Sequence, residues 1–338
     1  MASTGKSGLK RAALLGIIIS LLTIIVIFKF TETHLTWKVI YEVDIRFLML
    51  AFLFHSLFWI FWAIRLKKLS EFLGIQITLS YAFKTTLASG FLAAITPSSA
   101  GGEPLRVKML NDSGISFGAS SAIVLAERLL DAIFFISALP VMIFISDFSS
   151  RFGIYAGVVF TLFFVGFMFF MYLTFKDPEN VEKISAKISS FIARFSRSRG
   201  DRISSIINRE LMLFRDASVE LATVSKYQFS LLFILTALIW IFEFLVPSAI
   251  LLAMKTSPHW TESLTSQLFL VIISLVPLTP GSSGIAEAGM LYFYSLFVEK
   301  VYIGSLVGLW RVITYYSNLI VGLIVNVMVL KSRYLEED

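Results

Sequence analysis

Long apolar runs, each about the length that crosses a lipid bilayer, dominate this chain of 338 residues. A helix needs about 20 apolar residues to span the hydrocarbon. Runs of this kind cover residues 12–30, 46–66, 119–146, 152–175, 227–253 and 302–330. Charged residues make up only 15% of the chain, too few to cover a soluble domain of this size. The sequence therefore predicts an all-α polytopic membrane protein, one membrane domain over 1–338 with six full transmembrane helices.

Two further apolar stretches, 79–111 and 264–299, are interrupted by segments that a helix cannot continue through. The first is broken at 96–103 by Thr-Pro-Ser-Ser-Ala-Gly-Gly-Glu, and the second at 279–287 by Thr-Pro-Gly-Ser-Ser-Gly-Ile-Ala-Glu. Proline ends a helix and glycine and serine weaken it. Each stretch is therefore predicted to be a re-entrant hairpin of two half-helices that returns to the side it entered.

The distribution of basic residues predicts the orientation, because cytoplasmic loops carry an excess of Lys and Arg. With both hairpins re-entrant, the segments 1–11, 65–68, 176–226 and 331–338 lie on one side and carry eighteen Lys and Arg, against six on the other. We therefore expect both termini in the cytoplasm and the chain in the plasma membrane. The first run, 12–30, lacks a small-residue cleavage site and is read as an uncleaved helix.

The segment 176–226 is the only sizeable polar piece. Apolar residues recur there at helical spacing beside basic ones, as at Ile203, Ile207, Leu211 and Phe214. Such helices suit the anionic inner leaflet, but a cytoplasmic helical hairpin packed on the core fits equally well. Both readings stay open. The basic residues sit between apolar runs, so nucleic acid is not an expected partner.

The two breaks resemble each other, which predicts an internal repeat. Each contains Thr-Pro and Ser-Ser, with a glutamate four residues after the second serine. Glu103 precedes Arg128 by 25 residues, and Glu287 precedes Arg311 by 24. The predicted topology inserts the hairpins from opposite sides, as in transporters whose broken helices build a midplane site. The halves would be 46–146 and 227–330.

Ionisable residues at membrane depth mark function or pair with one another. Glu127 and Asp131 lie one turn apart on one helical face, so they predict either a charged cavity wall or an ion-pair network. Each break also exposes the N-terminus of a half-helix, where N–H groups and the helix dipole favour an anion such as phosphate. Glu103 and Glu287 could instead cap those groups. Glu243, alone in an apolar run, is expected to pair with an arginine.

The candidate site residues follow from this reasoning. The predicted substrate-binding residues are Ser98, Ser99, Gly101, Gly102, Arg106, Arg128, Ser282, Ser283, Gly284 and Arg311. The predicted coupling or gating residues are Glu103, Glu127, Asp131, Glu243 and Glu287. There is no cysteine, and three scattered histidines are too few for a His-based metal site. We expect no catalytic group, no metal and no cofactor.

Three motifs in order resemble the flippase-like superfamily that includes the transmembrane region of lysylphosphatidylglycerol synthases. They are Pro-x-x-x-Gly-Gly-Glu-x-x-Arg at 97–106, Glu-Arg-Leu-x-Asp at 127–131 and Pro-Gly-x-x-Gly-x-x-Glu at 280–287. The resemblance covers about 10–330 and implies a membrane core that handles aminoacylated phospholipids or polyprenyl-phosphate-linked sugars. The chain departs from the pattern at Ser282 and Ser283, where the family often has a further glycine. It carries no appended synthase domain, which favours translocation over catalysis.

The expected function is therefore translocation of an anionic or polyprenyl-phosphate-linked lipid, with its headgroup held between the hairpins. Anionic inner-leaflet lipids are expected partners, and a homodimer is left open. One alternative is an anion channel or exchanger, since glycine-serine turns at broken helix ends also hold anions in chloride transporters. The other is a lipid-phosphate transferase, in which Glu127 and Asp131 would hold a divalent metal.

Overall fold

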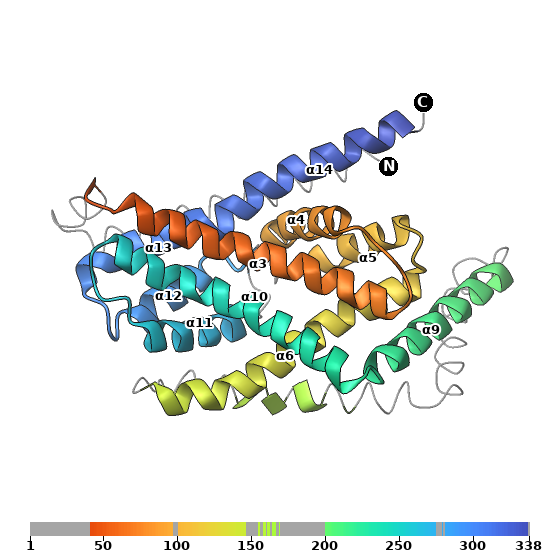
Figure 1. Cartoon of the computed structure of the whole chain (residues 1–338), viewed down its shortest axis with the longest axis horizontal. Coiled ribbons are helices and arrows are strands. Elements are labelled where there is room, and N and C mark those ends of the chain that lie inside the picture. Colours follow the sequence, from red (N-terminus) through yellow and green to blue (C-terminus); the bar gives the residue numbers. More distant parts are fainter. Residues whose placement is uncertain are drawn as a thin grey trace.

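The fold is built from helices throughout the part of the chain that the structure, a computed structural model, describes. These residues are 41–96, 101–146, 200–274, 279 and 281–336, with scattered positions between 155 and 169. No strand occurs among them. Four of their helical stretches are long and apolar enough to cross a membrane: α3 (Ile45–Phe72), α6 (Phe117–Ile145), α10 (Lys226–Ala253) and Lys300–Val329. Figure 1 shows α3 and α10 side by side, with α6 crossing below them and the last part of the fourth stretch, labelled α14, extending away.

Four of the six predicted spans, 46–66, 119–146, 227–253 and 302–330, are thereby confirmed as membrane-capable helices. The predicted span 12–30 lies outside the described residues, and 152–175 is described only at scattered helical positions. The segment 65–68, counted on the cytoplasmic side, belongs to α3, which continues to Phe72, and Arg65 within it is fully buried. Removing Arg65 from the loop count leaves seventeen basic residues against six.

The last span is not one regular α-helix. It consists of α13 (Lys300–Arg311), a π-helical segment η2 (Val312–Tyr316) and α14 (Ser317–Glu336). Short π-helical turns widen a helix locally and often occur at functional sites. This one begins directly after Arg311 and contains Tyr315. The helix is therefore widened at two residues whose side chains contact other parts of the fold.

Each broken stretch forms two short helices, as predicted. The first consists of α4 (Leu79–Ile95) and α5 (Gly102–Asp112), the second of α11 (Trp260–Ser274) and α12 (Ile285–Tyr294). The two helices of each pair pack against each other, so each pair is a helical hairpin. The Thr78 side chain caps α4 by accepting from the backbone N–H of Tyr81.

The long helices α3 and α10 form an antiparallel pair at the centre (Figure 1). Their opposite ends meet where the backbone N–H of Asp44 donates to the carbonyl of Ala253 at 2.9 Å. Packing around this pair is reciprocal, because α4 of the first half contacts α14 of the second, and α11 of the second contacts α6 of the first. Two halves related by an approximate twofold axis would pack in this way.

Each half also has its own apolar core. One cluster gathers α10 to α13 around Phe269, Met290 and Phe293 and includes Phe134 and Phe135 of α6. A second cluster gathers α3 to α6. Since α6 and α10 contribute to both clusters, the halves are joined by shared apolar packing as well as by polar contacts.

The described part of the polar segment, α9 (Gly200–Ala222), packs on α6. The Glu210 carboxylate accepts from the backbone N–H of Gly118 at 2.8 Å, in the first turn of α6. A Cβ atom at Gly118 would lie 2.1 Å from the carbonyl oxygen of Glu210, so only glycine allows the helices to approach this closely. For residues 200–222 the reading of a helix packed on the core is therefore the one observed.

Candidate functional site

The two breaks, far apart in sequence, meet in the structure. The backbone N–H of Gly281 donates to the carbonyl of Thr96 at 2.9 Å. Beside this bond, the Tyr315 hydroxyl donates to the carbonyl of Ala94 at 3.2 Å. The tips of the two hairpins therefore bind each other directly, and the π-helical segment of the last span is fastened to the same place.

Glycine at 281 makes this approach possible. Gly281 has φ of +54°, and a Cβ atom there would lie 2.3 Å from the carbonyl oxygen of Ala94. At the other tip, Gly101 donates its N–H to the Thr96 hydroxyl at 2.8 Å. These glycines thus allow segments of the protein itself to approach closely.

The polar groups of the second tip form hydrogen bonds within their own hairpin. Ser282 has φ of +53°, a conformation that glycine adopts more readily, and its hydroxyl donates to the carbonyl of Ser274 at 2.8 Å. Ser283 is buried. The N–H of Gly284 donates to the Glu287 carboxylate at 2.7 Å, so Glu287 caps α12. The predicted site residues Ser98 and Ser99 lie outside the described residues.

Glu287 also binds the arginine that the repeat spacing matched to it. Its Oε2 lies 2.7 Å from Nη2 of Arg311, and both side chains are buried. The Arg311 guanidinium lies over the rings of Trp310 and Tyr315, with its Cζ about 5 Å from each centroid. This ion pair ties the second hairpin to the last span.

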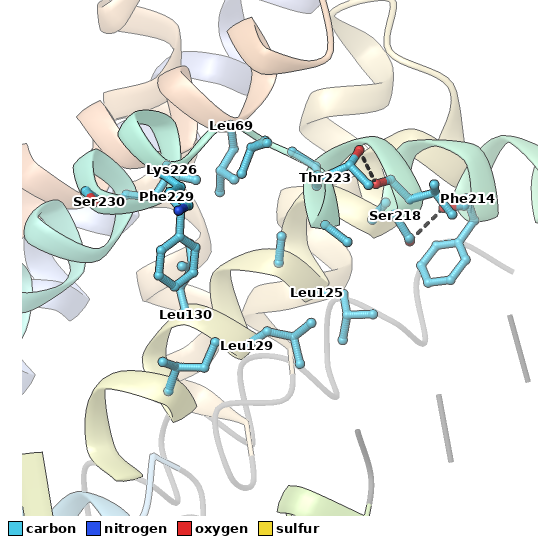
Figure 2. A pocket seen from close by; sticks show the side chains of 18 residues that line it. Leu69, Leu125, Leu129, Leu130, Phe214, Ser218, Thr223, Lys226, Phe229 and Ser230 are labelled. Carbon is cyan, nitrogen blue, oxygen red and sulfur yellow. Dashed lines mark hydrogen bonds between the residues drawn. The ribbon is translucent and has the colours of Figure 1, made fainter. Parts of the chain in front are cut away.

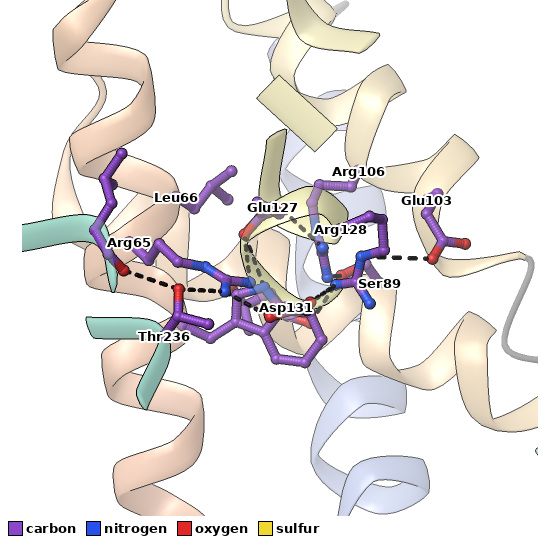
Figure 3. A network of polar contacts seen from close by, with 12 residues as sticks. Arg65, Leu66, Ser89, Glu103, Arg106, Glu127, Arg128, Asp131 and Thr236 are labelled. Carbon is purple, nitrogen blue, oxygen red and sulfur yellow. Dashed lines mark hydrogen bonds and ion pairs between the residues drawn. The ribbon is translucent and has the colours of Figure 1, made fainter. Parts of the chain in front are cut away.

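In the first half, buried ion pairs form a larger network on the face of α6 that carries Glu127 and Asp131 (Figure 3). Glu127 accepts from Nη1 of Arg106 at 2.9 Å and from the Trp62 indole at 2.8 Å. Asp131 accepts from Nη1 of Arg65 at 2.6 Å. Of the two predictions for these carboxylates, the ion-pair network is the one observed. Both side chains are almost inaccessible to solvent.

Several members of this network were missed from the sequence. Besides Arg65, they are Trp62, Trp240, whose indole donates to Asp131 at 2.9 Å, and Thr236, whose hydroxyl accepts from Arg65. Arg65 follows an apolar run and precedes two lysines, so it was counted with the loop. The available signal was helical spacing, since Trp62 and Arg65 are three residues apart and share a face.

The Trp62 ring brings three cations together. The guanidinium carbons of Arg106, Arg128 and Arg65 lie 4.6, 5.3 and 6.0 Å from its centroid. Aromatic faces attract cations over such distances, and Arg106 is held further by the Ser89 hydroxyl at 2.8 Å. The indole therefore lets three positive charges gather where the surrounding helices are apolar.

Arg128 is the accessible part of this network. Its side chain is 36% exposed and that of Glu103 is 35% exposed, while those of Arg106 and Glu127 are 4% and 0% exposed. Arg128 Nε lies 4.0 Å from Glu103 Oε1 and finds no hydrogen-bond acceptor. Its Nη2 lies 3.3 Å from Asp131. Arg128 thus joins the buried network to a loosely held carboxylate at its edge.

One of the two glutamate–arginine pairs is therefore accessible and loosely held, and the other is buried and close. Glu103 and Arg128 occupy the same relative positions as Glu287 and Arg311, yet the second pair is 2.7 Å apart and at most 5% exposed. Lys108, on α5, points outward and pairs with Asp112 at 3.3 Å. Of the arginines predicted to meet a phosphate, Arg128 is reachable in this structure, whereas Arg106 and Arg311 are buried with carboxylate partners.

The expected arginine partner of Glu243 was wrong. Glu243 Oε2 lies 2.6 Å from Nδ1 of His55, across the α3–α10 pair. The imidazole is fully buried and stacks on Phe58, with ring centroids 5.5 Å apart. Glu243 therefore joins the two central helices and takes no part in the arginine network among the contacts of the described residues.

Comparison with known proteins gives the family. Residues 13–322 match the family model described as the lysylphosphatidylglycerol synthase TM region. The chain belongs to this family. A UPF0104 membrane protein of Archaeoglobus fulgidus is 42% identical over 96% of this chain and 99% of its own length. A UPF0104 membrane protein of Pyrococcus horikoshii is 24% identical over 94% and 97%, respectively.

Membership confirms the resemblance inferred from the three motifs, and with it an integral membrane protein of a lipid-related family. The match to the lysylphosphatidylglycerol synthase TM region runs from 13 to 322, so both hairpin tips and both glutamate–arginine pairs fall within it. The A. fulgidus relative is covered along almost its whole length, so the likeness extends over the entire membrane core.

Proposed function

We propose that this protein translocates a lipid with an anionic or phosphate-linked headgroup, phospholipid or polyprenyl-phosphate-linked, across the membrane. The headgroup would bind at the edge of the arginine network, beside the hairpin tips, while the lipid tails stay in the hydrocarbon. No catalytic step is part of the proposal. Membership in the lysylphosphatidylglycerol synthase TM-region family supports a lipid substrate, and the geometry around Arg128 supports an anionic one.

The observation that carries the proposal is the loose and accessible pairing of Arg128 with Glu103. The network contains three arginines, Arg65, Arg106 and Arg128, and three carboxylates, Glu103, Glu127 and Asp131. Their formal charges cancel. If Glu103 swings away, one positive charge remains uncompensated in an apolar setting, where it strongly favours an anion.

A phosphate can take the place of Glu103. Arg128 Nε is buried and has no acceptor in this structure. Once Glu103 moves aside, Nε and an Nη atom can offer the two parallel N–H donors through which a guanidinium binds phosphate. Glu127 and Asp131 are already engaged by Arg106 and Arg65, so Arg128 keeps only its 3.3 Å contact with Asp131 when Glu103 leaves. Glu103 would then act as the gate that the headgroup displaces.

The proposal also includes how the hairpins and the termini are placed in the membrane. Both hairpins would be re-entrant and inserted from opposite sides, with their joined tips near mid-depth and both termini in the cytoplasm of the plasma membrane. In this setting the buried Glu287–Arg311 pair closes the path on the side of the second hairpin. Translocation requires this pair to open after the first pair has bound the headgroup.

A lipid-phosphate transferase is less well supported by the geometry. Such an enzyme needs carboxylates that are free to hold a divalent metal. Glu127 accepts hydrogen bonds from Arg106 and Trp62, and Asp131 from Arg65 and Trp240. Both carboxylates are thereby occupied by protein donors.

Headgroup translocation in reconstituted vesicles tests the proposal. Arg128→Ala should slow translocation of fluorescent phosphatidylglycerol by about 10- to 100-fold, the equivalent of losing a charge-assisted interaction of about 1.5–3 kcal/mol. Arg128→Lys should fall between Ala and wild type, because it keeps the charge but not the fork. Arg209→Ala, on α9 with a side chain 71% exposed, is the matched control. If Arg128→Ala and Arg209→Ala translocate equally well, Arg128 has no part in the site.

A further inference from the structure

A large apolar cavity lies on the opposite side of α6 from the arginine network. Its volume is about 920 Å³, within the range of pockets that bind small organic ligands. Figure 2 shows Leu125 and Leu129 of α6 on one wall and Phe214 of α9 and Phe229 of α10 on the others. Leu129 and the Glu127–Asp131 pair point to opposite sides of α6, because successive helix residues are 100° apart.

The cavity has the depth of one membrane leaflet. Its α6 wall extends from Ala122 to Ile133, which corresponds to about 16 Å of helical rise. Half of a typical hydrocarbon core is about 15 Å thick. A single acyl chain from the leaflet at which α10 begins would therefore run along this wall to about mid-membrane.

A cation lines the cavity beside Phe229 of α10 (Figure 2). Lys226 lines the cavity and is the first residue of the membrane-capable helix α10, which places it near the boundary between headgroups and hydrocarbon. It is exposed and makes no ion pair with any described residue. Lysines near a membrane surface attract anionic headgroups.

Two of the three hydroxyls of the wall are satisfied locally. The hydroxyl of Ser218 donates to the carbonyl of Phe214, and that of Thr223 to the carbonyl of Val219, as the dashed lines of Figure 2 mark. These two hydroxyls therefore need no hydrogen-bond partner from a ligand. The cavity thus offers one cation and an apolar body, which matches a phospholipid chain and its phosphate.

We infer that this cavity binds one acyl chain of an anionic phospholipid, with the lipid phosphate against Lys226. The inference rests on the proposed function for what happens next, since the bound lipid would be the one presented to Arg128. The site would hold a lipid at the edge of the protein before its headgroup moves inward.

Photo-labelling tests the site in vesicles of the full chain. The probe is phosphatidylglycerol with a diazirine in the middle of one acyl chain, and the labelled peptides are identified by mass spectrometry. In wild type, label should concentrate on 122–133 and 214–222. Leu129→Trp should reduce that label about tenfold by filling the space, the equivalent of a modest loss of affinity. Val219→Trp fills the cavity from the α9 wall and should act similarly if Leu129→Trp fails to fold.

Two further variants complete the design. Ile324→Trp places the same ring on an exposed position of α14 and should leave the label unchanged. Lys226→Gln should lower the preference for phosphatidylglycerol over phosphatidylcholine by about fivefold, as expected for one lysine at an anionic surface. Equal labelling in wild type, Leu129→Trp and Val219→Trp would overturn the inference. So would a cross-link showing that another segment of this chain, or a second copy, fills the cavity.

The same samples separate this inference from the proposed function. If Leu129→Trp abolishes labelling but wild-type vesicles translocate no lipid, the binding site stands and translocation is refuted. If wild type translocates lipid and Leu129→Trp and Val219→Trp label as well as wild type does, translocation stands and the cavity site is refuted.

Discussion

The matched glutamate–arginine pairs of the two halves give an internal test of the electrostatic argument, since they have nearly the same spacing but different burial. In the second half, Glu287→Gln removes the charge that Arg311 faces at 2.7 Å while leaving an amide oxygen to accept from Gly284. Breaking a buried ion pair by removing one partner typically lowers the free energy of unfolding by about 3–5 kcal/mol.

The double variant distinguishes lost charge balance from lost packing. Arg311→Met alone leaves Glu287 buried without its cation and should lower the free energy of unfolding by a similar amount, about 3–5 kcal/mol. In Glu287→Gln/Arg311→Met no charge is left unpaired, so its loss should not exceed that of either single variant. Independent effects would instead sum to about 6–10 kcal/mol.

The Glu103–Arg128 pair of the first half is the control. Glu103→Gln breaks the pair with Arg128, whose atoms are 4.0 Å apart and whose side chains are about one-third exposed, so its effect should stay below about 1 kcal/mol. Unfolding in mixed micelles with increasing sodium dodecyl sulfate, followed by the fluorescence of the six tryptophans, measures all four variants. An additive double variant, or equal losses for Glu103→Gln and Glu287→Gln, would refute the reasoning.

Three further predictions concern contacts away from these pairs. Gly281→Ala should lower the free energy of unfolding by about 1–3 kcal/mol, because a Cβ there meets the Ala94 carbonyl in a strained backbone; Gly166→Ala, with open space around it, should be neutral, and equal melting of the two variants would contradict this. His55→Phe should lower the free energy of unfolding by about 1–3 kcal/mol by leaving Glu243 without its partner, and His55→Phe/Glu243→Leu should recover part of that loss in the same unfolding assay. Burial raises the pKa of Glu210, but hydrogen bonds from Arg209 and from the N–H of Gly118 outweigh it, so the pKa lies below its ordinary value of 4.5. The docking of α9 should therefore be fully stabilised above about pH 4.5 and weaken as the pH falls through the lowered pKa; a spin label at Leu213 should gain mobility there, and an unchanged pH response in Glu210→Gln would contradict the assignment.

The parts of the fold that depend on local sequence could be predicted. Helix breaks are a property of proline, glycine and serine in series, so both hairpin breaks were placed correctly. The pairing of each break with a later arginine was visible because Glu103–Arg128 and Glu287–Arg311 have nearly equal spacing. That spacing indicated the repeat, and the contact of each glutamate with its arginine is seen in the structure.

What depends on helix rotation and packing could not be predicted. Arg65 looked like a loop residue because two lysines follow it, and only the path of α3 shows that it is buried against Asp131. The choice of His55 as the partner of Glu243 depends on how α3 and α10 cross. The unequal burial of the two matched pairs is likewise a property of the assembled halves, since their local sequences are similar.

Purified protein in sealed vesicles measures the central claim most directly, when lipid and ion movement are followed in the same sample. Accessibility of fluorescent phosphatidylglycerol to an impermeant reductant reports headgroup translocation, and a chloride-sensitive dye reports free anion flux. The account predicts that wild type exposes phosphatidylglycerol from the inner leaflet faster than protein-free vesicles do, and that Arg128→Ala does not, with no chloride flux in either. Chloride flux that depends on Arg128 without any lipid translocation would contradict it and identify an anion pathway instead.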